Sequence, residues 1–449
     1  MQEIKVSEKH TYTILILTLV SIISCIIFKI FLFYGFLASM FVTSYFLVKN
    51  GFSITELLNV IKNGLYQCRT LFILILLIGA MISIWMTSGV VPTMLYYGLK
   101  YLQGMNFLFA AFVITSIVSI FMGTAFGTIS SIGIALFGLS NIFGIPNYIL
   151  LGALVSGAFI ADRISPISSL FNLTLETAKL SYKNASLSIL KTLLPAYFVS
   201  GLIYYLIGKR YSIVLSGSKV DSFISAVNRN FVVSPFLLLL PLSIIILSFL
   251  GMKIIRALSL ALSAGVIVSV WLQKARFIDV IAAIINGYKI KTDSAALNSA
   301  LISGGTISMI SILLIIAGAI GLSSLFQETG FIVPVIEKLT QRIKSYEKLI
   351  LYTGLISGAL TAISDQSVGI ILPIKLLSVK YKELEIENTA MVRTISDTGV
   401  VIAPLIPWNV NSLFIYITMG IPTMVYAPYA VLCYLSPVFT CIFAYLYKF

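Results

Sequence analysis

Long apolar runs separated by short polar connectors make up most of the chain. A helix that crosses a membrane needs roughly 20 consecutive apolar residues, and many of the runs reach or approach that length. Lys29 separates the first two runs, and Lys191 and Pro195 interrupt a later one. The pattern predicts spans at residues 12–28, 30–48, 71–87, 188–207, 231–250, 254–272 and 301–322.

One long uncharged stretch, residues 101–161, cannot be a single span. It is enough for about two spans with a break between them, at about 20 residues each. Small residues mark the candidate breaks at 123–128, which reads "GTAFGT", and at 144–146. The stretch therefore predicts helices that are interrupted inside the membrane.

A second apolar region is interrupted by an aspartate. Residues 349–363 would form only about 22 Å of helix at 1.5 Å per residue, which is less than the roughly 30 Å of a bilayer core. Together with residues 367–374 they would cross. This predicts one discontinuous span whose unwound middle is Ser364, Asp365, Gln366 and Ser367.

The remaining segments are amphipathic or charged. Residues 52–69 place Phe52, Leu57, Val60 and Ile61 at helical spacing among polar residues, which predicts an amphipathic helix at the membrane surface. Residues 90–102 predict a short helix or half-helix, 276–291 an amphipathic segment, and 324–348 and 375–393 polar connectors. In total we expect an all-α polytopic membrane protein with about eleven (10–12) transmembrane helices.

Composition supports that class. Of 449 residues, 59% are hydrophobic and 10% are charged, and the mean hydropathy is +1.04. A soluble domain is about half apolar and a quarter charged. The first ten residues are polar and the run behind them is long enough to span, so we expect no cleavable signal.

The charge and the rare residue types exclude several functions. The formal net charge is +14, but the basic residues lie in connectors between apolar runs, so we expect contact with anionic lipids and no nucleic acid. The single histidine, His10, and four scattered cysteines disfavour a His-ligated metal, a His-based catalytic triad and a disulfide framework. We expect no enzyme and no cofactor.

Three acids stand apart from the other thirteen. The thirteen lie in the tail or in polar connectors, whereas Asp162, Asp365 and Asp397 lie in small, otherwise nearly uncharged sequence. Intramembrane acids are costly and mark ion or proton pathways by default. The alternative for each is a structural carboxylate paired with Arg163 or Arg393.

The break and the acid occur twice. "GTAFGTISSIG" at 123–133 is followed by "ADRISPISS" at 161–169, and "TAISDQSVGI" at 361–370 is followed by "SDTGVVIAPLIPWN" at 396–409. The interval from Thr124 to Thr361 is within two residues of that from Asp162 to Asp397. The pattern predicts an internal duplication with discontinuous helices. The expected units are 1–69, an N-terminal hairpin with an interfacial helix; 70–210, the first repeat; 211–300, connecting spans; and 301–449, the second repeat.

Local signals refine the two acid motifs. Ser165 and Pro166 make a favourable N-cap and first position, so we expect a helix that starts there and directs its positive end at Asp162. Pro404 and Pro407 interrupt the second motif. Trp408 would give that motif an aromatic wall, and Asn409 would give it an amide.

These segments resemble the NhaC family of Na⁺/H⁺ antiporters. "GTAFGTISSIGIALFG" is similar to its G-T-x-F-G-T segment, and "SGAFIADRISPISS" to its G-A-x-x-G-D-K-x-S-P-L-S-D motif. "TAISDQ", "DTGVVIAPLIPWN" and "GIPTMVYAPYAVLCYLSP" resemble its T-A-S-D-Q, E-D-S-G-x-x-x-S-P-L-I-P-W-N and closing segments. The resemblance runs from about residue 70 to the C-terminus. It implies inverted-topology repeats and alternating access.

The sequence departs from the family pattern at four positions. Ala161 replaces a usual Gly, and Arg163 replaces a Lys. Ser169 and Ser396 stand where the family has acids. Two carboxylates are therefore absent from the region expected to bind cations, and a site with less negative charge would tolerate an anionic or zwitterionic solute better.

The leading hypothesis is exchange of Na⁺ or Li⁺ for H⁺. Asp365 and Asp397 would bind Na⁺ and H⁺ in competition, and Asp162 would pair with Arg163 to assemble the first repeat. Oxygen ligands would come from Ser364, Ser367, Thr398, Thr124 and Thr128. Substrate contact or gating would fall to Arg163, Ser165, Trp408 and Asn409.

The same residues are compatible with one other transport function and support two further functions less well. The first alternative is Na⁺- or H⁺-coupled transport of a small organic anion of the malate or lactate type, or of an amino acid, with Arg163 or Asn409 contacting the solute. A passive channel suits paired breaks with titratable acids less well than coupled exchange. An intramembrane aspartyl protease is disfavoured because Asp365 and Asp397 both follow Ser and no Gly-x-Gly-Asp motif is present.

We expect a multi-pass protein of the plasma membrane. Lys49, Lys62 and Arg69 follow the second span and favour a cytoplasmic N-terminus. The expected partners are membrane lipids, Na⁺, H⁺ and a small organic acid or amino acid, and a homodimer is compatible with the sequence.

Overall fold

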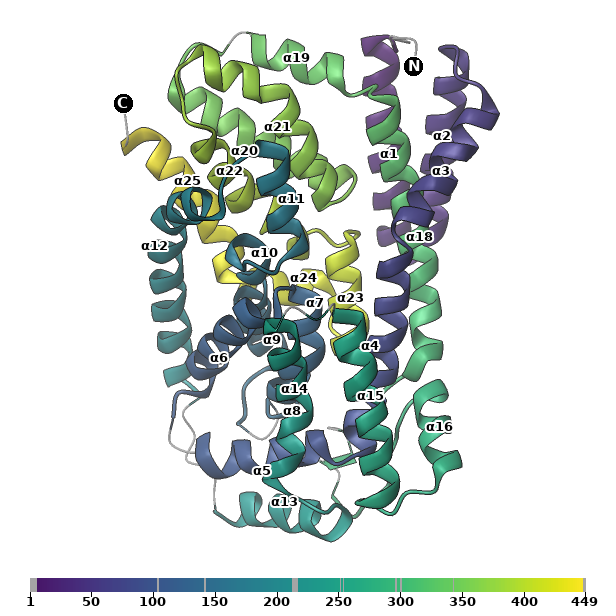
Figure 1. Cartoon of the computed structure of the whole chain (residues 1–449), viewed down its shortest axis with the longest axis vertical. Coiled ribbons are helices and arrows are strands. Elements are labelled where there is room, and N and C mark those ends of the chain that lie inside the picture. Colours follow the sequence, from purple (N-terminus) through teal and green to yellow (C-terminus); the bar gives the residue numbers. More distant parts are fainter. Residues whose placement is uncertain are drawn as a thin grey trace.

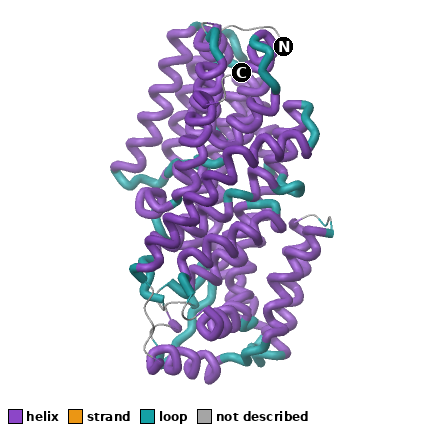
Figure 2. The backbone as a smooth tube through the Cα atoms, turned by 90° about the vertical axis from the view of Figure 1, so that its left-hand side faces the viewer, coloured by secondary structure: helices purple, strands orange, loops and turns teal. Residues whose placement is uncertain are grey.

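The computed structural model is helical throughout the part of the chain that it describes (Figure 2). The described residues are 6–102, 105–140, 143–211, 217–250, 252, 254–294, 297–298, 301–341 and 343–446. Within them the only β pairing is an isolated bridge between Lys289 and Ile302. The predicted all-α class is confirmed, while the outer ends of the predicted units 1–69 and 301–449 lie outside the described residues.

Among the described residues, six helices are long and apolar enough to cross a membrane, or up to nine if each of three bent helix pairs counts as one span. The six are Lys9–Ile27, Leu32–Lys49, Arg69–Thr87, Asn147–Ala178, Tyr182–Lys209 and Gly305–Thr329. Shorter apolar helices cover Phe107–Met122, Ile255–Trp271 and Phe277–Asn286. A polytopic membrane protein is confirmed, and the described helices account for six to nine of the expected crossings by length and composition.

The N-terminal helices form the predicted hairpin. α1 (Glu8–Ile27) and α2 (Leu32–Lys49) run side by side, and Lys29 between them has a left-handed backbone with φ 54°. Ser7 begins α1 by accepting a hydrogen bond from the His10 N–H at 3.3 Å. α2 packs on α18 (Gly305–Thr329), the longest span of the second half (Figure 1), while α1 packs mainly on α2.

The predicted amphipathic helix is present as α3 (Ile54–Gln67), and it packs against other helices. α3 leads directly into α4 (Arg69–Thr87), and both helices run along α18 in the direction opposite to it. Gly64 of α3 faces Ser324, and Gly79 of α4 faces Met309 and Gly305. Glycine at both positions allows this close approach, as small residues do between membrane helices. The apolar side of α3 therefore reflects packing against a helix.

Both interrupted segments fold back on themselves as helical hairpins. In the first, α6 (Phe107–Met122) is followed by a chain of short helices, α7 (Ala125–Thr128), the π-helix η1 (Ile129–Gly133) and α8 (Ile134–Gly138). In the second, α20 (Tyr346–Ile363) is followed by α21 (Gln366–Glu383), which lies beside it in Figure 1. The predicted single discontinuous span through Asp365 is therefore wrong.

Cross-contacts prove the hairpin geometry. The hydroxyls of Thr353 and Tyr381 lie 2.9 Å apart, and Ser357 Oγ donates to the Gly369 carbonyl at 2.6 Å, so α21 retraces α20. In the first hairpin, the rings of Phe107 and Phe143 stack at 4.3 Å between centroids, which brings its two ends together. The two ends of each hairpin therefore lie on the same side of the molecule, and its tip lies inside the protein.

Two other segments cross with a break between two helical parts. The first is α9 (Asn147–Ala158) and α10 (Ala161–Ile164), followed by α11 (Ser169–Ala178). The second is α22 (Asn388–Ile395) with the π-helix η3 (Ser396–Val400) and the 3₁₀ turn η4 (Ala403–Leu405), followed at a 42° bend by α23 (Val410–Met419). Discontinuous helices are therefore present, but they lie at residues 147–178 and 388–419, whereas the sequence predicted one through Asp365.

The remaining helices flank this core. α12 (Tyr182–Lys209) is continuous through Pro195 and packs on α25 (Val431–Leu446), which follows α24 (Thr423–Tyr426) and the 3₁₀ turn η5 (Ala427–Tyr429). The predicted span 231–250 forms the 3₁₀ turn η2 (Pro235–Leu238) and α14 (Leu239–Phe249), which follow α13 (Gly217–Asn230) at a bend of 85°. The other elements are α5 (Val90–Leu102), α15 (Ile254–Trp271), α16 (Phe277–Asn286) and α19 (Val333–Gln341).

Helix starts recur at one interval in the two halves. The first helical residues are separated by 241 residues in four pairs: Ala125 and Gln366, Asn147 and Asn388, Ser169 and Val410, Tyr182 and Thr423. In that register Thr124 corresponds to Asp365, and Ser168 to Asn409. The acids Asp162 and Asp397, which the sequence pattern paired, do not correspond.

Cysteines at positions 107 and 143 should be cross-linked by a short bifunctional thiol reagent in a variant that lacks the four native cysteines. The reason is that the stacked rings hold these positions together only if the first interrupted segment is a hairpin. Mass spectrometry of the cross-linked peptides measures the outcome. A pair at 121 and 143 is the control, because position 121 lies about 21 Å along α6 from position 107 at 1.5 Å per residue, and efficient cross-linking of the control alone would contradict the hairpin.

Candidate functional site

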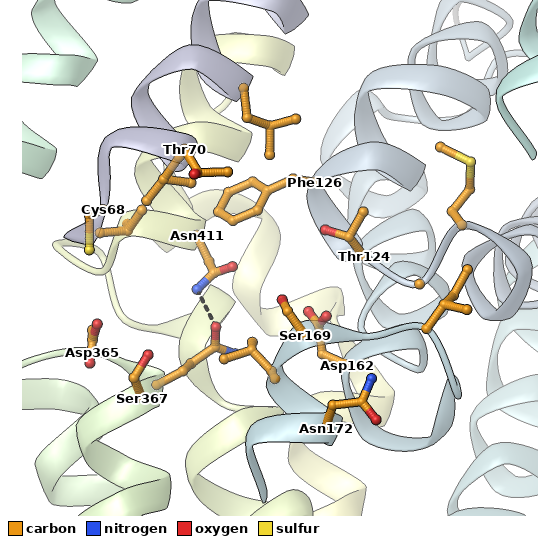
Figure 3. A pocket seen from close by; sticks show the side chains of 18 of the residues that line it. Cys68, Thr70, Thr124, Phe126, Asp162, Ser169, Asn172, Asp365, Ser367 and Asn411 are labelled. Atoms are coloured by element: carbon orange, nitrogen blue, oxygen red, sulfur yellow. Dashed lines mark hydrogen bonds between the residues drawn. The ribbon is translucent and has the colours of Figure 1, made fainter. Parts of the chain in front are cut away.

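The tips of the two hairpins and the breaks of the two crossing segments meet at one cavity of about 730 Å³. The first hairpin contributes Gly123 and Thr124, and the second contributes Asp365, Gln366 and Ser367. The crossing segments contribute Asp162 with Ser169, and Asn409 with Asn411. The junction of α3 and α4 completes the wall with Gln67, Cys68 and Thr70 (Figure 3).

Asp365 begins the second arm of its hairpin. Its backbone is extended, with φ −146° and ψ 178°, and its Oδ1 accepts the Val368 N–H at 2.9 Å as the N-cap of α21. The preceding Ser364 points away from the cavity and donates to Ser323 Oγ at 2.5 Å. The carboxylate of Asp365 therefore caps α21 and also lines the cavity.

Asp162 is buried at the break of the first crossing segment. Its Oδ1 accepts a hydrogen bond from Ser168 Oγ at 3.3 Å, and Ser168 Oγ in turn accepts the Phe171 N–H at 3.3 Å as the N-cap of α11. The predicted helix start at Ser165 is wrong. Ser165 ends α10 and donates to the Ile120 carbonyl at 2.6 Å, because Pro166 lies in a turn that closes from Ser168 N–H to Ser165 O.

A network of side-chain amides lies between the two acids. Asn411 Nδ2 donates to Gln366 Oε1 and to Asn409 Oδ1, both at 2.9 Å, and Gln366 Nε2 donates to the Val400 carbonyl at 2.7 Å. Asn409 Nδ2 donates to the Thr361 carbonyl at 3.2 Å. The sequence analysis did not name Gln366 or Asn411 as site residues. Gln366 follows the predicted Asp365 directly, and Asn411 lies two residues after the predicted Asn409.

Figure 3 shows the two acids on opposite sides of Asn411, with Asp365 and Ser367 on one side and Asp162 and Ser169 on the other. No ion pair of either acid is found among the described residues, and no described residue that lines the cavity is Lys or Arg. Ser169, which stands where the resembled family has an acid, faces the same space. The cavity therefore presents two carboxylates without a basic partner.

Asp397 is held elsewhere, in a fully buried ion pair with Arg163. Its second oxygen accepts Thr440 Oγ1 at 2.6 Å, and Arg163 also donates to Ser436 Oγ at 2.8 Å. The predicted pair of Asp162 with Arg163 is wrong, because Arg163 points to the second half of the chain. Arg163 does not line the cavity and is not placed to contact a solute there. Its ion pair with Asp397 is the pairing that the structural alternative gave for this acid.

Other predicted site residues hold the backbone around the cavity and do not line it. Thr128 donates to the Thr124 carbonyl at 2.8 Å, and Thr398 to the Thr394 carbonyl at 2.6 Å. Trp408 Nε1 donates to the Ala362 carbonyl at 2.5 Å, which ties the second break to the end of α20. Of the predicted set, the cavity brings together Asp365, Asp162, Thr124, Ser367 and Asn409.

No cluster of three or more His, Cys, Asp or Glu side chains that could hold a metal is found in the described part of the chain. A cation in this cavity would instead be held by one or two carboxylates together with hydroxyl and amide oxygens. Hard oxygen ligands of this kind suit small, non-transition cations.

Hairpin tips and broken crossing helices that meet at a polar cavity define a class of protein, the secondary active transporters. A family model described as "Na+/H+ antiporter family" matches residues 169–447. The Na⁺/H⁺ antiporter NhaC of Alkalihalophilus pseudofirmus is 30% identical over 84% of this chain and 82% of its own. The chain therefore belongs to the Na⁺/H⁺ antiporter family.

Two further relatives come from Bacillus subtilis. The Na⁺/H⁺ antiporter NhaC is 28% identical over 86% of this chain and 85% of its own. A malate-2H⁺/Na⁺-lactate antiporter is 27% identical over 92% of this chain and 88% of its own. The resemblance inferred from the motifs is confirmed.

Proposed function

We propose that this protein exchanges Na⁺ for H⁺ by alternating access, with both ions competing for Asp365. The observation that carries the proposal is a carboxylate at a hairpin tip, open to the cavity and without a basic partner in the described chain. The two NhaC relatives, each aligned over more than four fifths of this chain, support the same activity.

The chemistry follows from the oxygen atoms around Asp365. Its carboxylate would bind Na⁺ together with oxygens from Ser367 and Asn411, which also line the cavity. A proton on the same carboxylate removes the charge that attracts Na⁺. Since the two ions exclude each other at one group, release of one on a given side permits uptake of the other.

Asp162 supplies a second negative charge to the cavity. We propose that it contributes to cation attraction from the far side of the amide network. Asp397 has no such role in this proposal, because its ion pair with Arg163 satisfies it and keeps it away from the cavity.

We also propose a repeat organisation, a membrane location and an assembly for this protein. The constant interval between helix starts supports two repeats, within the units 70–210 and 301–449. We propose a plasma-membrane protein with a cytoplasmic N-terminus, in contact with lipids and compatible with a homodimer, which transports its ions without a cofactor.

Exchange of a small organic anion is the second candidate, and the malate/lactate relative favours it. The cavity supports it less well, because the arginine expected to contact the anion, Arg163, is buried in an ion pair. An anion would also face Asp162 and Asp365.

A Na⁺ or Li⁺ gradient across liposomes that contain the purified protein should change the pH of the lumen, as read by an internal pH dye. The lumen should become alkaline when the cation flows inward and acidic when it flows outward. K⁺ serves as the control cation and protein-free liposomes as the blank. Malate, lactate and amino acids are added in parallel without Na⁺. Proton movement that requires one of these solutes, with none driven by Na⁺ alone, would replace the first candidate with the second.

A further inference from the structure

The cavity carries more negative charge than its surroundings balance. Asp162 has only 6% of its surface exposed, yet its recorded side-chain partner is a neutral hydroxyl, Ser168. A buried carboxylate without a cationic partner is costly unless it is protonated or meets a cation. Two such acids in one cavity favour an occupant with positive charge at two places.

The size and lining of the cavity exceed what a single Na⁺ needs. Cavities of about 300–1,000 Å³ are typical of small organic ligands, and this one measures about 730 Å³. Apolar side chains line it between and around the polar groups: Leu74, Met122, Phe126, Ile167, Leu170 and Val410. A dehydrated metal ion gains nothing from such walls, whereas methylene groups are stabilised by burial against them.

The polar groups are arranged as two ends and a middle. Asp365 with Ser367 lies on one side of Asn411, and Asp162 with Ser169 on the other (Figure 3). Each end offers a carboxylate and a hydroxyl oxygen, which suits an ammonium group that donates three hydrogen bonds. The middle, formed by Gln366 and Asn411, is neutral.

We propose that the cavity also binds and transports linear organic dications, namely α,ω-diammonium compounds such as 1,4-diaminobutane. One ammonium group contacts Asp365 and the other contacts Asp162, and the methylene chain lies along the apolar wall. This inference rests on the proposed function in that the diammonium compound occupies the Na⁺ position at Asp365. It adds Asp162 as the residue that selects two charges over one.

The test compares a diamine with its matched monoamine. Uptake of ²²Na⁺ into proteoliposomes, driven by a pH gradient, is measured with 1,4-diaminobutane or n-butylamine at a pH where both are protonated. The inhibitory concentration of the diamine should be at least about ten-fold lower than that of the monoamine, because the second charge gains a charge-assisted hydrogen bond. Diamines of two to eight carbons should show one preferred length.

Variants assign the second contact. Asp162→Asn should bring the inhibitory concentrations of the diamine and the monoamine within about two-fold of each other, and Asp162→Glu should restore the preference and shorten the preferred diamine. Asp279→Asn, at an exposed acid paired with Arg276, should leave the preference unchanged. Size-exclusion elution identifies any variant that fails to fold.

Two results would overturn the proposal: equal inhibition by diamine and monoamine in the wild type, or a preference that survives Asp162→Asn. Counterflow of labelled 1,4-diaminobutane separates this failure from failure of the proposed function, because counterflow requires no Na⁺. Counterflow without any ²²Na⁺ uptake would refute the Na⁺ exchange and retain the diamine site. Uptake of ²²Na⁺ without counterflow would do the reverse.

Discussion

Replacing Asp365 with Asn should lower Na⁺/H⁺ exchange by about one to two orders of magnitude, since loss of a charged ligand costs about 1.5–3 kcal/mol and each tenfold change corresponds to about 1.4 kcal/mol. An amide does not bind and release a proton at the pH of the exchange reaction. It also lacks the negative charge that holds Na⁺. Asn is also as good an N-cap as Asp, so α21 should still begin at the same residue. The substitution therefore isolates the carboxylate from the fold.

Dye-quench exchange in everted vesicles measures this loss across a range of Na⁺ and Li⁺ concentrations. Asp365→Glu should retain partial exchange with a changed cation preference, because the charge remains but moves by one methylene. Asp279→Asn, an exposed acid in α16, is the matched control and should exchange like the wild type. Full activity of the Asp365→Asn variant would remove Asp365 from the coupling mechanism.

Replacing Asp397 with Asn should destabilise the protein by about 3–5 kcal/mol, because the change leaves the Arg163 guanidinium buried without its partner. Both side chains of this pair are fully buried. The pair connects α10 in the first half with η3 in the second, and Ser436 and Thr440 attach it to α25. Arg163→Met should be similarly harmful, whereas Arg163→Met combined with Asp397→Leu should recover much of the stability.

Thermal unfolding in detergent, followed by intrinsic fluorescence, measures these differences in stability. The exposed pair of Arg276 and Asp279 is the control, and its disruption should cost at most about 1 kcal/mol. If Asp397→Asn unfolds like the wild type and instead shifts the Na⁺ dependence of exchange, the sequence-based role of Asp397 as an ion acceptor would be correct after all.

The sequence identified the right acids as unusual but could not separate their roles. Asp162, Asp365 and Asp397 all lie in small, nearly uncharged sequence, and the composition around each is alike. Which acid meets a base depends on contacts between residues more than 200 positions apart, as Arg163 and Asp397 show. A neighbouring residue in the chain, such as Arg163 beside Asp162, points about 100° away around a helix and is a poor guide to pairing.

The interrupted segments show the same limit. Small residues and a mid-segment aspartate marked breaks at 123–128 and 364–367, of which the structure leaves 123–124 and 364–365 outside helices. The length argument then assumed that the chain continues in one direction after each break. Gly123, with φ 67°, ends α6 in the left-handed region that glycine adopts readily, and the chain reverses there. Local sequence marks such an end, but the direction that follows depends on which helices are available to pack against.

The sequence by itself determined the all-α membrane class, most of the long spans, the positions of the breaks and the family. These follow from the length and hydrophobicity of local segments and from motif order, which need no knowledge of distant contacts. Only the tertiary structure decided that the breaks are hairpin tips, that α3 lies along α18, and that Asp365 and Asp162 share a cavity from which Asp397 is withdrawn. The physical reason is that burial and charge pairing are properties of residues brought together from distant parts of the chain.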